Sequence, residues 1–162
     1  MAVTLTWKGV TGSSPTKVAL SPANTLDYGS VQAGSWGTPV KCVCATVAGG
    51  NISTVKFWWR ATTATGKGDM KGSDPWAHTY NKIAQAGTYV DPSTILQATF
   101  SAWSPMPYGI DPTTISPPPF TMTDTASGAD TDYLYFAIQP PADAADGDWS
   151  GWSYRMSFLY SS

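Results

Sequence analysis

Apolar and polar residues alternate along several short stretches of the chain. The alternation is clearest at 3–7, 40–47 and 55–60, and it returns at 133–139 and 152–160. A period of two is typical of β-strands, because successive side chains of a strand point to opposite faces of the sheet. In 40–47 both alternating sets are apolar, which predicts a central strand that is buried on both faces.

Two shorter stretches, 16–20 and 120–125, complete the set of strand candidates. Gly49-Gly50-Asn51 separates two of the longer candidates and is a strong turn signal. A total of about seven or eight strands is typical of two antiparallel sheets packed face to face. We therefore expect an all-β protein folded as an antiparallel β-sandwich.

The middle of the chain, about 61–128, is expected to be rich in loops. Glycine and proline interrupt the alternation repeatedly there. Asp91 followed by Pro92 predicts one short helical turn through residue 97, because Asp accepts hydrogen bonds from free amide groups and Pro suits the first helical position. The three prolines at 117–119 predict a sheet edge or an extended spacer, since proline cannot donate to a ladder.

The composition agrees with short strands joined by turns. The chain has 162 residues with 15 Gly and 13 Pro, and all eleven acidic residues are Asp. Glu is a good helix former, so its absence disfavours long surface helices. The length suits one core, and we expect a single domain spanning 1–162.

The charge pattern excludes several classes of partner. The net charge is -2, only 12% of the residues are charged, and the nine Lys and Arg are scattered. We therefore expect no binding to nucleic acid. No apolar run reaches the roughly 18 to 20 residues that cross a bilayer. The start, MAVTLTWKGV, lacks the basic and apolar regions of a secretory signal, so we expect synthesis in the cytoplasm and no signal peptide.

Few residues are suited to catalysis. The chain has one histidine, His78, and neither a glutamate nor a Gly-x-Ser-x-Gly nucleophile motif. Ser150 follows Asp148 closely, but no histidine lies near them in the sequence to activate the serine. We interpret His78 as an exposed loop residue. The sequence therefore predicts no enzymatic activity and no catalytic residue.

Cys42 and Cys44 lie two residues apart in a predicted strand. Their side chains would share one face about 7 Å apart, which is beyond comfortable reach of a disulfide. We expect two small buried side chains. With one histidine, the chain offers too few ligands for zinc, and we expect no metal and no cofactor.

Aspartates gather in two predicted loops: Asp124, Asp130 and Asp132 in one, and Asp143, Asp146 and Asp148 in the other. Loops of β-sandwiches can offer Ca²⁺ the oxygen ligands it needs. Neither group fits a twelve-residue loop closed by Glu. We favour carboxylates that bond their own turns, with calcium binding as the alternative.

Aromatic residues are more numerous than one core of this size requires, with 8 Trp, 8 Tyr and 5 Phe. Trp58 and Trp59 are adjacent in a predicted strand and must point to opposite faces, so at least one is expected to leave the inner side. Surplus aromatic surface marks contact with another molecule, although long loops could also bury it in small satellite cores. The candidate binding residues are Trp58, Trp59, Trp76, Trp103, Tyr108, Trp149 and Trp152.

Two segments carry a resemblance to known domains. LDYGSVQAG, followed by PVKCVCATVAGGNISTVKFWW, resembles the start of immunoglobulin-like domains of the ASH and PapD-like kind. There Gly29 and Gly34 would adopt backbone angles that other residues resist and let the chain switch sheets. The ending IQPPADAADGDWSGWSYRMSF looks like the last hairpin of bacterial and phage immunoglobulin-like modules. The resemblance implies an immunoglobulin-like sandwich, a fold that carries many functions.

The segments WKGVTGS, VKFWWR and IQPPADAADG, together with long Pro/Thr-rich loops, are similar to those of tailed-phage virion proteins. This resemblance implies a non-enzymatic capsid decoration or tail protein that binds neighbouring protein subunits. It implies a homo-oligomer, with a trimer favoured, located in the virion. Residues 1–9 would form an arm or an edge strand paired with a neighbour's sheet.

Two alternative functions stay open from the sequence. One is a carbohydrate-binding module, in which Trp58 or Trp59 and loop aromatics stack on sugar rings. The other is a chaperone-like immunoglobulin domain that pairs strands with a partner.

Overall fold

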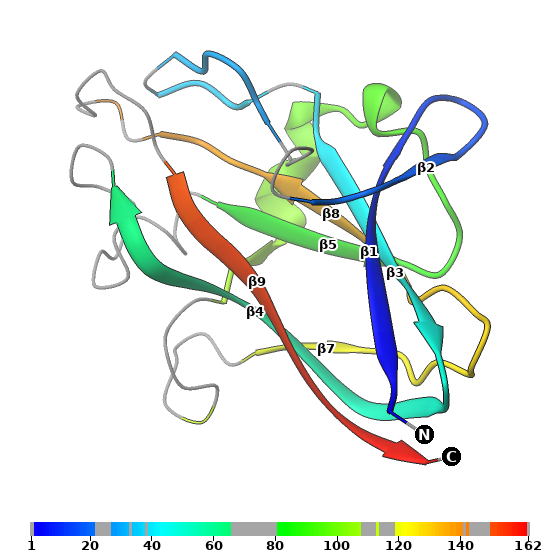
Figure 1. Ribbon diagram of the computed structural model, residues 1–162. Helices are drawn as coiled ribbons and strands as arrows, with labels where there is room; N and C mark the ends of the chain where they lie inside the picture. Colours follow the sequence, from blue (N-terminus) through cyan, green and yellow to red (C-terminus); the bar gives the residue numbers. More distant parts are fainter. Residues whose placement is uncertain are drawn as a thin grey trace.

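The alternating segments form two antiparallel sheets (Figure 1). The computed structural model describes residues 2–21, 27–32, 34–37, 39–65, 81–107, 113, 119–140, 142 and 150–161; for 60–65 and 150–154 it describes the backbone. The strands are β1 (Thr4–Thr11), β2 (Thr16–Ala19), β3 (Lys41–Ala48), β4 (Asn51–Thr65), β5 (Lys82–Ala86), β6 (Ser104–Pro105), β7 (Phe120–Met122), β8 (Tyr133–Ala137) and β9 (Ser150–Ser161). Two 3₁₀ helices, η1 (Pro92–Thr94) and η2 (Gln97–Ala102), complete the described elements.

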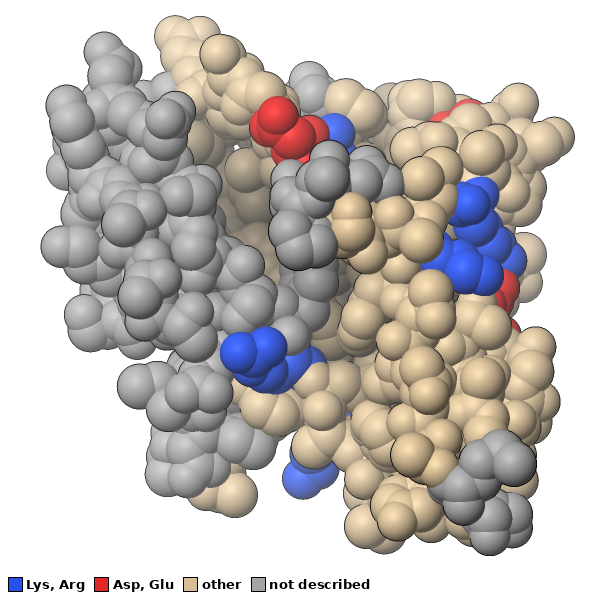
Figure 2. Space-filling model, in the orientation of Figure 1, with Lys and Arg blue, Asp and Glu red and all other residues tan. Residues whose placement is uncertain are grey.

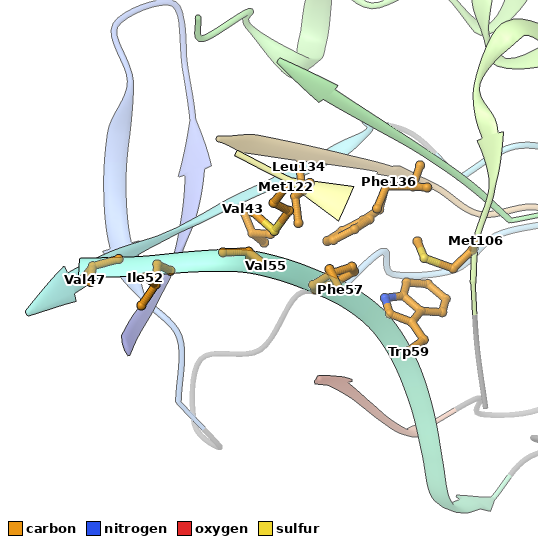
Figure 3. Packing of buried hydrophobic residues seen from close by; sticks show 11 residues of the cluster. Val43, Val47, Ile52, Val55, Phe57, Trp59, Met106, Met122, Leu134 and Phe136 are labelled. Atoms are coloured by element: carbon orange, nitrogen blue, oxygen red, sulfur yellow. The ribbon is translucent and has the colours of Figure 1, made fainter. Parts of the chain in front are cut away.

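One sheet has six strands in the order β2-β1-β3-β8-β5-β6, and the other has three in the order β7-β4-β9. Every pair of neighbouring strands is antiparallel. The expected all-β sandwich is therefore confirmed. Its core lies between the sheets, where rings from β4 and β8 meet: Phe57 stacks on Phe136 at 5.7 Å between ring centroids, with Trp59 beside them (Figure 3).

Strand β3 is buried on both faces, as its two apolar sets predict. Val43 and Val47 point into the core between the sheets. Cys42 and Cys44 point to the other face, where the segment around η2 supplies Phe100 as a second cover. Both cysteines are free and buried, as expected. The six-stranded sheet thus has apolar contacts on both of its sides.

The chain changes sheets at a different turn from the one the resemblance implies. Gly29 and Gly34 do have positive φ, 63° and 76°. However, the strands before and after them, β2 and β3, belong to the same six-stranded sheet. The change occurs between β3 and β4, at Gly49 and Gly50. The expected sheet switch at Gly29 and Gly34 is therefore wrong, because a positive φ allows a sharp turn but does not decide which sheet follows.

The expected last hairpin is also absent. β8 lies in the six-stranded sheet between β3 and β5, whereas β9 pairs with β4 in the other sheet. Both segments form strands, as their alternating apolar residues predict, but β8 pairs with β3 and β5 whereas β9 pairs with β4. Sequence proximity favours hairpins, yet each strand pairs where its apolar face is best buried.

The middle region is more regular than expected. It contains β5, which pairs with β8 over five residues. Asp91 caps η1 by accepting a hydrogen bond from the Ser93 amide, which confirms the predicted start. The helical turn ends at Thr94 rather than at 97, and η2 follows as a separate 3₁₀ helix. Of the prolines at 117–119, two lie outside the described residues.

Candidate functional site

The predicted binding residues do not form one described patch. Trp58 and Trp59 are each only 6% exposed, so neither presents a free ring at the surface. Trp103 is half-buried and lies against Phe100, on the other face of the six-stranded sheet from Trp59. The backbone of Trp152 pairs with Ala61. The side chain of Trp152 and the whole of Trp76, Tyr108 and Trp149 lie outside the described residues.

A different surface is left open by the pairing of the strands. β9 is the last strand of its sheet, and β4 is its one partner among the described strands. β1 is covered by β2 over Lys8–Thr11, while residues 4–6 pair with β3 alone. Figure 1 shows that the start of β1 and the end of β9 lie close together, beside the labelled N and C ends of the chain. One side of the sandwich thus carries two strand edges with no described neighbour.

Apolar side chains lie along these two edges. Val3 just before β1, Leu5 and Trp7 on β1, and Met156 and Phe158 on β9 are only partly buried, and all of them pack against the core between the sheets. At the end of β9, Leu159 is 64% and Tyr160 is 66% exposed. We name these seven residues, Val3, Leu5, Trp7, Met156, Phe158, Leu159 and Tyr160, the edge surface.

Two ends of the edge surface meet at the β3–β4 turn. A side chain built on Gly50 would lie 2.7 Å from the Ser161 carbonyl oxygen and 3.1 Å from Val3 Cγ2. The start of β1 and the end of β9 are therefore close neighbours, although they belong to different sheets. The edges form one continuous side of the molecule at that corner.

The edge surface carries no charge of its own. Residues 2–7 and 156–161 contain no Lys, Arg, Asp or Glu, and 156–161 contain neither Pro nor Gly. Figure 2 shows this side with its charged residues in separate groups. Sheet edges are ordinarily protected by Lys, Pro, bulges or short length. An apolar edge without Lys or Pro is suited to pairing with another strand.

The sequence predicted the part of the edge surface in residues 1–9, but the part on β9 was missed, although one signal was present. Phe158, Leu159 and Tyr160 are three consecutive large apolar residues in a predicted strand. They cannot all point to one face, because side chains alternate. At least one of them therefore has to lie on the outside of the sheet.

One group of charged residues lies around Asp130. Its carboxylate accepts a 2.5 Å hydrogen bond from Lys17 Nζ and another from Thr46 Oγ1, and Lys8 Nζ lies 3.9 Å away. The ammonium of Lys17 also lies 5.5 Å from the Tyr133 ring centroid. These contacts hold strand β2 against the middle of the six-stranded sheet.

The neighbouring aspartates bond the chain around them. Asp124 accepts the amide of Thr54, a residue with a φ of 54° at the bulge in β4, and Asp132 accepts the amide of Thr123. The expectation that these carboxylates bond their own turns is therefore wrong, because Asp124 and Asp130 bond residues of strands far away in the sequence. Within the described residues no group of three His, Cys, Asp or Glu is placed to hold a metal ion. Asp143, Asp146 and Asp148 lie outside those residues.

Replacing Asp130 with asparagine is expected to lower the free energy of unfolding at pH 7 by at most about 1 kcal/mol, since the ion pair is partly exposed. Burial alone raises the pKa of Asp130, but the hydrogen bonds from Lys17 and Thr46 outweigh burial, and the pKa is lowered. Such a carboxylate adds stability above its unfolded pKa of about 3.9 and loses it as the pH falls through its folded pKa.

Urea unfolding of Asp130→Asn and of the unchanged protein between pH 7 and pH 2 measures this contribution. The two stabilities should converge as the pH falls below about 3.9. A difference that stays constant over the whole range would contradict the ionic role of Asp130.

The buried thiols are not suited to nucleophilic chemistry. Burial raises the pKa of Cys42 to about 12 and also raises the pKa of Cys44. The thiolate is the reactive form of cysteine, so both residues are inert at neutral pH while the protein is folded.

Among the described residues no helix is long and apolar enough to span a membrane. No protein-family model, curated protein or solved structure matches this chain.

Proposed function

We propose that this chain is a non-enzymatic structural protein of a tailed-phage virion, a capsid decoration or tail component that binds neighbouring protein subunits. The edge surface is the observation that supports the proposal most directly. It combines two open strand edges with partly buried core residues and the exposed Leu159 and Tyr160. A surface of this kind is suited to binding a polypeptide rather than a small polar molecule.

Strand pairing gives such a contact its energy and its orientation. An added strand satisfies the outer N–H and C=O groups of the edge, and its alternate side chains reach the apolar residues beside it. In this chain those residues include Leu5 and Trp7 on one edge and Met156 and Phe158 on the other. Covering both edges and their side chains could approach the roughly 1,200–2,000 Å² that stable protein interfaces bury.

The sequence resemblance to virion proteins supplies the class of partner. The sequence predicts an arm or an edge strand at residues 1–9. In the fold β1 pairs with β2 and β3 of the chain's own sheet, which does not fit a detached arm, and β2 leaves residues 4–6 uncovered. The partner would therefore approach the open part of β1, at residues 4–6, instead of receiving a detached arm. Location in the virion and assembly as a homo-oligomer belong to the same proposal.

Co-sedimentation with phage particles that lack this protein tests the proposal. The unchanged chain should bind the particles, and Tyr160→Lys should reduce binding by at least about tenfold, since a buried unpaired charge is costly. Leu96→Lys is the matched control, because Leu96 is 70% exposed and lies in the segment between η1 and η2, away from the edge surface. Absence of binding, or equal loss in both variants, contradicts the proposal.

A carbohydrate-binding role is the second candidate. Trp36 and Trp103 are half-buried, and the centroid of each ring lies 4.9 Å from that of Phe100. Of these two, Trp103 is a candidate binding residue, and a stacking platform there would use it. The buried Trp58 and Trp59 do not support the platform expected from the sequence. Retardation in polysaccharide affinity gels that is lost in Trp103→Ala would favour this role.

A further inference from the structure

We propose that the strand that pairs with β9 is β9 of a second copy of this chain, in an antiparallel pair across a two-fold axis. This rests on the proposed function, in which the edge surface binds protein, and it names the partner at one of the two edges.

The outer edge of β9 is long enough to form such a pair. β9 has twelve residues and is paired with β4 as far as Ser161. Its last six residues include no charge, proline or glycine, and the bulge beside them lies in β4, on the side away from the open edge. Every copy of the chain presents the same edge, so two copies can satisfy each other's free backbone groups.

The side chains select one register for this pair. The two-fold axis of an antiparallel pair is perpendicular to the sheet, so inward-facing residues oppose inward-facing ones. Met156 and Phe158 face the core. With Phe158 at the axis, Tyr160 lies opposite Met156 of the second copy and Leu159 lies opposite Ser157. Both exposed apolar side chains then gain a neighbour, and cross-strand pairs of this kind stabilise sheets.

The same register keeps like charges apart. Arg155 is the one charged residue of β9. With Phe158 at the axis, Arg155 lies opposite Ser161, and the two copies of Arg155 are six residues apart, or about 20 Å. That distance exceeds the screening length of about 10 Å at 0.1 M salt. A register centred on Arg155 would instead place two arginines directly opposite each other.

The size of the contact predicts its strength. The pair covers seven residues, about 24 Å of strand. A strip of this length buries less than the roughly 1,000 Å² or more of a stable interface. We therefore expect a weak dimer, detected in a concentration series and not at a single dilute concentration. The trimer that the sequence resemblance implies would need a different contact.

Sedimentation equilibrium between about 5 µM and 1 mM tests the pairing. The unchanged chain should pass from monomer to dimer. Tyr160→Lys and Leu159→Lys should each weaken the dimer by at least about tenfold, since each places a charge in the paired strip. Leu96→Lys should leave the dimer unchanged, and circular dichroism should show the same β-sheet spectrum for all variants.

Disulfide trapping tests the register. Ser157→Cys mixed with Leu159→Cys should form a disulfide-linked heterodimer under mild oxidation, because these positions are opposite each other across the axis. Ser157→Cys alone should link poorly, because its two copies lie diagonally. The native thiols Cys42 and Cys44 are buried and should not take part.

A chain that stays monomeric up to 1 mM overturns the pairing, as does a trimer that the lysine variants leave intact. Preferential linkage of Ser157→Cys to itself overturns the register. These failures are distinct from failure of the proposed function. A monomer that binds phage particles overturns the pairing alone, and a dimer that binds no particle overturns the proposed virion role alone.

Discussion

Replacing Phe57 with alanine is expected to lower the free energy of unfolding by about 3–5 kcal/mol, the usual cost of removing a buried aromatic ring. The Phe57 side chain is 0% exposed and lies between the two sheets. Its ring centroid is 5.7 Å from that of Phe136 (Figure 3) and 5.9 Å from that of Trp7. Removing the ring leaves a cavity that rigid strands on both sides cannot close.

Thermal and urea unfolding measure the effect of Phe57→Ala. For a chain of this size we expect Tm to fall by about 6–20 °C. Phe57→Leu keeps most of the volume and should cost less than about 1.5 kcal/mol. Leu96→Ala, at a residue that is 70% exposed, should change stability by less than about 0.5 kcal/mol. Similar losses in Phe57→Ala and Leu96→Ala would contradict this description of the core.

The second large effect is expected at the turn where the chain changes sheets. Gly49→Ala should cost about 2–4 kcal/mol, from two sources that add. Gly49 has a φ of +86°, which a residue with a side chain adopts only with strain. In addition, the new Cβ would lie 2.5 Å from the carbonyl oxygen of Ala2, so the start of the chain next to β1 has to shift.

Gly128 provides a matched control for the turn. Its φ is +85°, but no atom lies within 4 Å of an added Cβ. Gly128→Ala should therefore show the backbone strain alone, about 1–2 kcal/mol. Urea unfolding of both variants separates strain from steric overlap. Equal losses would mean that the overlap of the new Cβ at position 49 with the Ala2 carbonyl oxygen has no cost.

The local features of the fold could be predicted from the sequence. The two apolar sets of 40–47 specify a strand that is buried on both faces, because the period of two fixes which side chains share a face. The Asp91-Pro92 pair specifies the start of η1, because capping depends on adjacent residues only. Gly29 and Gly34 have the positive φ that their turns require. Each of these depends on interactions within a few residues.

The pairing of strands depended on the tertiary structure. β5, KIAQA, has little alternation of its own and forms a strand because β8 and β6 pair with its two edges. β8 and β9 follow each other in the sequence but join different sheets. Whether a strand has a free edge also depends on tertiary structure, because it is set by which other strands pair with it.

The edge surface also depended on the tertiary structure, because exposure follows from how the strands pair. The sequence by itself determined an all-β chain, a double-faced central strand and an excess of aromatic residues. It could not determine that Trp58 and Trp59 are both buried while Leu159 and Tyr160 are exposed. Alternation assigns a side chain to a face of its strand, but exposure depends on what packs on that face, and in this protein the packing comes from segments far apart in the chain.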